Sequence, residues 1–166
     1  NFHARFSAIK RQYLFKIINR SSPLTLDKDR HWHVRRTLDL EKMKEGASYL
    51  IGKHDFTTFR STLCQSKSPI KSIDKINIRT IDSFTGPSIH IEFEAQSFLH
   101  NQIRSIVGTL EKVGAHVWTP ERVKLALHAK NRSRCGPVAP PAGLYLTNVD
   151  YENLLNELTK IKKKFI

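Results

Sequence analysis

The feature that most constrains the fold is a change of hydrophobic period in the centre of the chain. Residues 71–82 and 88–95 alternate apolar and polar side chains, which is typical of strands with one buried face. The segment 84–87 between them contains Gly and Pro, so the two strands are predicted to form an antiparallel hairpin. Apolar residues then recur every three or four positions over residues 103–113, which predicts a helix that ends near Gly114.

The same kinds of pattern predict the remaining elements. The first two are a strand at residues 11–19 with Tyr13, Phe15 and Ile17 on one face and a helix at 40–51 that Asp39 caps and Gly52 ends. Thr119 and Pro120 begin another helix, which a rigid loop at 136–143 follows. The chain then continues with a strand at 144–151 and an amphipathic basic helix at 151–166. The order contains a hairpin and no repeated strand-helix-strand crossovers. We therefore expect an α+β fold, with an antiparallel β-sheet and helices packed on one face, in a single domain over residues 1–166.

Length and composition limit the class of protein. A chain of 166 residues suits one domain, and an apolar fraction of 39% supplies a core. The apolar runs are too short for a membrane span. Only two cysteines, Cys64 and Cys135, and the lack of a secretory signal favour a reduced, intracellular compartment. The chain begins with Asn1 and not with Met, so we expect a fragment whose upstream part is missing.

The charge of the chain points to its partner. The 28 Lys and Arg residues outnumber the 15 Asp and Glu residues, which gives a net charge of +13. Such an excess favours a polyanion, because each Lys or Arg beside a phosphate releases condensed counterions. A solvated, lysine-rich surface is the alternative. The basic residues occur in clusters separated by aromatic and apolar residues, which is typical of a folded face that binds nucleic acid.

The sequence lacks the motifs of several common catalytic and binding sites. The eight His and two Cys residues do not have metal-ligand spacing, and neither a phosphate-binding glycine loop nor a GxSxG turn is present. Glu92 and Glu94 fall on the solvent side of a predicted strand, and Asp55 lies in a local turn. None of these carboxylates is an obvious catalytic acid.

Five segments, taken together in order and spacing, carry a specific resemblance. They are FHARFSA (2–8), RQY (11–13), GKHDFTTFR (52–60), FLHNQIRSIVGTL (98–110) and GPVAPPAGLYL (136–146). In this order they closely resemble the carboxy-terminal half of the bacterial tRNA pseudouridine synthase A family, and the match extends to about Tyr151. The family has two tyrosines flanking one residue where this chain has Tyr13 and Phe15, and Tyr13 matches the functional position.

The resemblance implies an activity and its setting. Members of the family isomerise uridine to pseudouridine at positions 38–40 in the anticodon stem-loop of tRNA, without a metal or an organic cofactor. The resemblance also implies a homodimer in the full-length protein and a cytoplasmic location. The essential aspartate of the family lies in an RTDxGVHA-like motif upstream of the FHARF segment, and this chain does not contain that motif. We therefore expect the chain to be inactive alone.

The resemblance also assigns site residues. Arg104 matches the family arginine and would stabilise the ionised aspartate, and Tyr13 would stack on an extruded base with its hydroxyl near the carbon that loses a proton. Leu144 and Leu146 would form the apolar wall of a uracil pocket. Without the resemblance, Arg104 reads as an exposed or phosphate-binding arginine, Tyr13 as a buried strand tyrosine and the leucines as core. Residues expected to hold the RNA backbone or shape the cleft are His3, Arg5, Arg11, Arg60, Lys67, Lys71, His100 and Asn101.

The sequence leaves three functional classes open. The first is the catalytic domain of the synthase, the second is a non-catalytic RNA-binding module of the same fold, and the third is a structural domain for RNA assembly. The first predicts that Tyr13, Arg104 and Leu144 line one concave cleft with Arg60 or Arg5 on its basic rim. The third predicts no concave cleft around Tyr13 and Arg104.

Overall fold

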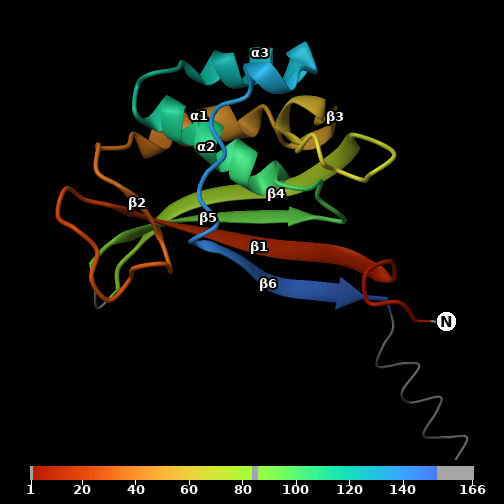
Figure 1. Ribbon diagram of the computed structural model, residues 1–166, viewed down its shortest axis with the longest axis horizontal. Helices are drawn as coiled ribbons and strands as arrows, with labels where there is room; N and C mark the ends of the chain where they lie inside the picture. Colours follow the sequence, from red (N-terminus) through yellow and green to blue (C-terminus); the bar gives the residue numbers. More distant parts are fainter. Residues whose placement is uncertain (1, 84–85, 153–166) are drawn as a thin grey trace, which may run out of the picture.

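The computed structural model describes residues 2–83 and 86–152, in which one six-stranded sheet is covered by helices on one face (Figure 1). The strands are β1 (Ala8–Asn19), β2 (Trp32–Val34), β3 (Gly52–Asp55), β4 (Ile70–Ile81), β5 (Ser88–Ala95) and β6 (Leu144–Tyr151). The helices are α1 (Leu40–Ser48), α2 (Gln102–Gly114) and α3 (Pro120–Ala129), with 3-10 turns η1 (Thr57–Phe59) and η2 (Arg132–Arg134). The predicted α+β class and the one-sided helical layer are confirmed.

The sheet has the order β2-β1-β5-β4-β3, and β6 pairs with β1 outside this path. The predicted hairpin is formed by β4 and β5, whose register pairs Ile78 with Ile91. Every pairing is antiparallel except that of β2, which runs parallel to the last three residues of β1. The sequence did not predict β2, because three residues are too few to show an alternating pattern.

The segment between α1 and β3 differs from its prediction. The helix was expected to continue to residue 51 and to stop at Gly52, but it ends at Ser48. Gly52 instead begins β3 with a φ of 99°, in the left-handed region that glycine adopts without strain. β3 pairs with β4, so Gly52 marks the start of an unpredicted edge strand.

The core lies between the sheet and the helices. Phe15 and Phe93 are fully buried on the sheet side, and Ile106 and Leu110 are fully buried on α2. Within residues 2–83 and 86–152, none of the helices combines the length and hydrophobicity that crossing a bilayer requires. The basic helix predicted at the carboxy-terminal end lies, from residue 153 onward, outside the described residues.

Candidate functional site

Tyr13 lies in the middle of β1, on the face of the sheet that the helices cover. Its neighbours across the strands are Phe93 on β5 and Leu146 on β6. Tyr13 is half-buried, and its ring meets the ring of Phe98 edge-on, with centroids 5.4 Å apart. Because Phe98 lies just before α2, this contact brings the start of that helix to the middle of β1.

Arg104 lies in the first turn of α2 and is held by two hydrogen bonds. Its Nε donates to the carbonyl oxygen of Ala139 over 2.7 Å, and its Nη1 donates to Oδ1 of Asn101 over 3.2 Å. Among residues 2–83 and 86–152, Nη2 has no hydrogen-bond partner. The guanidinium is therefore fixed in orientation by its neighbours while one of its nitrogens is free for a ligand.

The start of α2 is built to place Arg104. Asn101 precedes the helix with a φ of 60°, a left-handed conformation that Asn tolerates better than most residues. Gln102 is fully buried, and its Oε1 accepts a hydrogen bond of 2.7 Å from the backbone of Leu99. The predicted RNA-contacting residue Asn101 thus has an evident structural partner in Arg104.

The loop at 136–143 packs on α2 and completes this arrangement. A Cβ at Gly108 would lie 1.8 Å from the carbonyl oxygen of Pro137, so only glycine fits this helix position. The backbone nitrogen of Ala139 donates to the carbonyl oxygen of Arg104 over 3.0 Å. Loop and helix are therefore joined through both the backbone and the side chain of Arg104.

These elements line a small open cavity of about 350 Å³. Tyr13, Arg104 and Leu144 all line it, from three segments that are far apart in the sequence. His100 and Asn101 form part of the same lining, and Phe98 and Arg5 line this cavity as well. The expected grouping of Tyr13, Arg104 and Leu144 around one concavity is present, contrary to what a purely structural domain predicts.

A larger hollow of about 840 Å³ adjoins the small cavity, and the two share Arg5, Tyr13 and Phe98 as lining residues. We call this larger hollow the basic groove, and its cations are Arg5, Arg11, Lys67 and Lys71. The lining of the groove and of the small cavity includes no Asp or Glu. Within the described part of the chain, none of these cations forms an ion pair.

A thiol beside the groove, that of Cys64, has a shifted pKa. The pKa of the Cys64 thiol lies below its ordinary value, although burial acts to raise it. Backbone hydrogen bonds at Ser66 and His100 and the charges of Arg60 and Lys71 stabilise the thiolate. Local hydrogen bonds thus stabilise the thiolate more than the nearby cations do.

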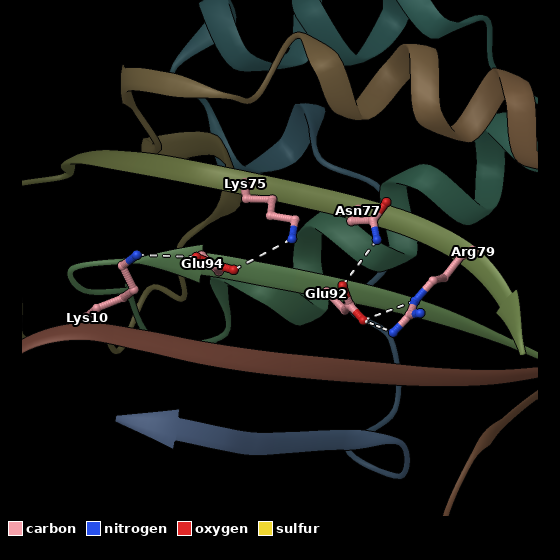
Figure 2. Close-up of polar contacts among 6 residues, drawn as sticks. All are labelled: Lys10, Lys75, Asn77, Arg79, Glu92 and Glu94. Carbon is pink, nitrogen blue, oxygen red and sulfur yellow. Dashed lines mark hydrogen bonds and ion pairs between the residues drawn. The ribbon is translucent and has the colours of Figure 1, made fainter. Parts of the chain in front are cut away.

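The opposite face of the sheet, which we call the open face, has paired charges (Figure 2). Glu94 lies 3.4 Å from Nζ of Lys10 and 3.7 Å from Nζ of Lys75. Glu92 accepts hydrogen bonds from Arg79 and from Asn77, the latter over 3.1 Å. The expected position of both glutamates away from the core is confirmed, and neither lies in the small cavity.

Three predicted site residues lie outside both hollows. Leu146 is 54% exposed and is not part of either lining, so of the two predicted leucines only Leu144 lines a hollow. Arg60 follows η1 and lies near Asp55, whose pKa is lowered, against the effect of burial, by hydrogen bonds from Thr57 and by the charges of Lys130 and Arg60. His3 packs against a neighbouring ring and does not line a wall. Of the two expected rim arginines, only Arg5 lies at the hollows.

Sequence reasoning missed Phe98, which lines both hollows and orients Tyr13. Its place in the FLHNQIR segment was a usable signal, because an aromatic residue there begins the segment that carries Arg104. For metal binding, the described residues contain no cluster of three or more His, Cys, Asp or Glu side chains.

Comparison with known proteins places these residues in a family context. A family model described as tRNA pseudouridine synthase matches residues 47–152. The tRNA pseudouridine synthase A of Ruegeria sp. (strain TM1040) is 52% identical over 150 residues, which cover 90% of this chain and 58% of that protein. The protein of the same name from Paracoccus denitrificans (strain Pd 1222) is 55% identical over 152 residues, covering 92% and 58%. The chain thus spans less than two thirds of the length of these relatives.

Proposed function

The chain belongs to the tRNA pseudouridine synthase family, and on this basis we propose that its small cavity and basic groove form part of a site that isomerises uridine to pseudouridine in tRNA. The target uridines are those at positions 38–40 of the anticodon stem-loop. The complete enzyme acts as a homodimer in the cytoplasm. The nucleophilic aspartate comes from a segment outside these 166 residues, which lack an RTDxGVHA-like motif.

The reaction rearranges one nucleotide without adding or removing atoms. The bond between N1 of uracil and C1′ of the ribose breaks, the base turns, and a bond forms between C5 and C1′. The proton on C5 leaves, and N1 ends with a proton. A base inside a duplex exposes neither atom suitably, so the uridine must leave the stack and enter a pocket.

The small cavity supplies the surfaces that such a base needs. Leu144 gives an apolar wall, and the half-buried ring of Tyr13 gives an aromatic one with a hydroxyl that can assist the loss of the C5 proton. The free Nη2 of Arg104 is available to pair with the carboxylate of the aspartate and keep it ionised. Arg104 is fixed by Asn101 and Ala139, so little ordering is needed when the carboxylate arrives.

The proposal rests on one observation: the small cavity adjoins a groove whose lining includes cations and no carboxylate. Arg5, Arg11, Lys67 and Lys71 line the groove, and none of them forms an ion pair with a carboxylate of the described residues. Uncompensated cations beside a base-sized cavity match the phosphate backbone of an RNA strand whose base enters the cavity. The groove would therefore position the backbone, and the cavity would receive the uridine.

The test compares this chain with a longer protein in which it follows a segment carrying an RTDxGVHA-like motif. Each protein is incubated with an anticodon stem-loop RNA, and pseudouridine is measured by mass spectrometry of the digested RNA. We expect product only from the longer protein, and a loss of roughly 100-fold or more in rate for Arg104→Ala. Activity of the 166-residue chain alone would show that the nucleophile is misplaced. RNA binding without turnover by the longer protein would favour the non-catalytic module instead.

A further inference from the structure

Residues 2–7 form a turn that presents one aromatic ring to solvent. Phe6 is 75% exposed, the largest exposed fraction among the Phe, Tyr and Trp side chains of residues 2–83 and 86–152. The ring of His3 packs on it with centroids 4.5 Å apart, and the guanidinium of Arg5 lies 5.6 Å from its centroid. So exposed a ring contributes little to the core, and its two neighbours leave a large part of it open to a ligand.

The turn that carries Phe6 is held by many contacts. Ser7 and His3 exchange hydrogen bonds, with the backbone of Ser7 donating to the His3 carbonyl over 2.8 Å and the backbone of His3 donating to Ser7 Oγ over 2.9 Å. The hydroxyl of Tyr151 donates to the carbonyl of Ala4 over 2.9 Å, and Arg11 donates to the carbonyl of Arg5. The turn is thus tied to β6 and β1, and Phe6 is presented by a preorganised support.

Phe6 also lies where RNA would pass. It lines the basic groove together with Arg11, Lys67 and Lys71. Its neighbour Arg5 lines both the groove and the small cavity. A strand whose uridine enters the small cavity and whose backbone follows the groove must therefore pass Arg5 and meet Phe6.

We propose that Phe6 is a stacking platform for the nucleobase next to the extruded uridine. This inference rests on the proposed function and extends it to a residue that neither the resemblance nor the phosphate contacts required. Extrusion removes one stacking partner from the adjacent base, and the face of Phe6 replaces that partner. Because every base has a π-face, the platform accepts any neighbour and suits an enzyme that acts within different surrounding sequences.

The experiment uses the 166-residue chain and stem-loop RNAs with 2-aminopurine beside the target uridine or at the far end of the stem. Fluorescence reports stacking on the probe, and anisotropy of a labelled stem-loop reports affinity. The variants are Phe6→Ala, Phe6→Trp, Lys67→Ala/Lys71→Ala and Leu125→Ala. Leu125 is a matched control, because it is 61% exposed on α3 and lines neither hollow.

We expect Phe6→Ala to weaken RNA binding about tenfold and to change the signal of the adjacent probe alone. Phe6→Trp should keep both properties, and Leu125→Ala should match the unaltered chain. Circular dichroism of each variant confirms that the fold is kept.

Other outcomes separate the platform from the proposed function. If Phe6→Ala binds RNA normally while the double lysine variant binds weakly, the platform is wrong and the RNA groove stands. If Phe6→Ala instead changes only the oligomeric mass, the ring covers another protein chain and the platform is again wrong. If the unaltered chain binds no stem-loop RNA, both the platform and the proposed function fail.

Discussion

The two sides of the sheet differ in whether their charged side chains form ion pairs. On the open face, Glu94 lies between Lys10 and Lys75, and Glu92 pairs with Arg79 (Figure 2). In the basic groove, by contrast, four cations line a hollow that contains no carboxylate. Lysines and arginines are abundant on both sides, so their number does not distinguish the surfaces. The difference lies in whether the protein supplies its own counter-charge, and where it does not, an external anion can do so.

The largest effect is expected from removing charge in the groove. Lys67→Ala/Lys71→Ala should weaken stem-loop RNA binding roughly thirtyfold, or about 2 kcal/mol, since two charge-assisted phosphate contacts are lost. The slope of log affinity against log salt should also fall by about two. Binding is measured by fluorescence anisotropy across a range of salt concentrations.

The matched control for this experiment is Lys10→Ala/Lys75→Ala, which removes the same charge from the open face. Its affinity should stay within about threefold of the unaltered chain, because both lysines already face Glu94 and long-range interactions are screened. Equal losses from the two double variants would mean that only net charge matters, and the distinction between the surfaces would fail.

A smaller effect is expected from breaking a pair on the open face. Glu92→Gln should lower the free energy of unfolding by about 1 kcal/mol, because a hydrogen-bonded carboxylate loses its charge beside Arg79 and Asn77. RNA affinity should not fall, since the site lies away from the groove. Urea denaturation measures the first quantity and anisotropy the second. A fall in affinity with unchanged stability would contradict the separation of roles.

The smallest effect concerns pH. Burial, opposed in part by Asp27, lowers the pKa of His31, and burial together with the charges of Lys16 and Arg79 lowers the pKa of His90. Below the ordinary value of 6.5, the unfolded chain therefore binds more protons than the folded one. Stability from these groups is complete above that pH and decreases as the pH falls toward the lowered values.

Urea denaturation between pH 7 and pH 5 tests this expectation. The pKa of Glu92 is also lowered, so that carboxyl titrates at a more acidic pH, outside this window. Replacing both histidines with Gln should flatten the profile over this window. A profile that keeps its slope in the double variant would assign the pH dependence to other groups.

The elements that the sequence predicted correctly are those whose pattern is long enough to repeat. The hairpin of β4 and β5 and the helix α2 each show several periods, and β6 begins and ends where expected. β2 and β3 have only three and four residues, and their pairing with distant strands creates them. Whether such short strands form depends on tertiary contacts, which a local sequence pattern does not contain.

Prediction of the candidate site from the sequence has the same limit. Tyr13 and Arg104 were predicted as site residues from the family motifs, and the prediction that both line one cavity agrees with the structure. The absence of Leu146 from both linings could not be anticipated, because Leu146 is the direct partner of Tyr13 on β6 and its side chain is nevertheless 54% exposed. The place of Arg60 depends on how η1 turns away after Phe59, which no sequence period specifies.

The loop at 136–143 fixes the distance between α2 and β6. It is attached at Gly136 by a hydrogen bond of 3.1 Å to Thr109, at Ala139 by the bonds to Arg104, and at Gly143 by a bond of 2.8 Å to the backbone of Lys16. With both ends and the middle attached, the number of residues in the loop sets the separation of α2 from β6. Inserting or deleting one residue would change the width of the small cavity, which Arg104 of α2 and Leu144 of β6 both line.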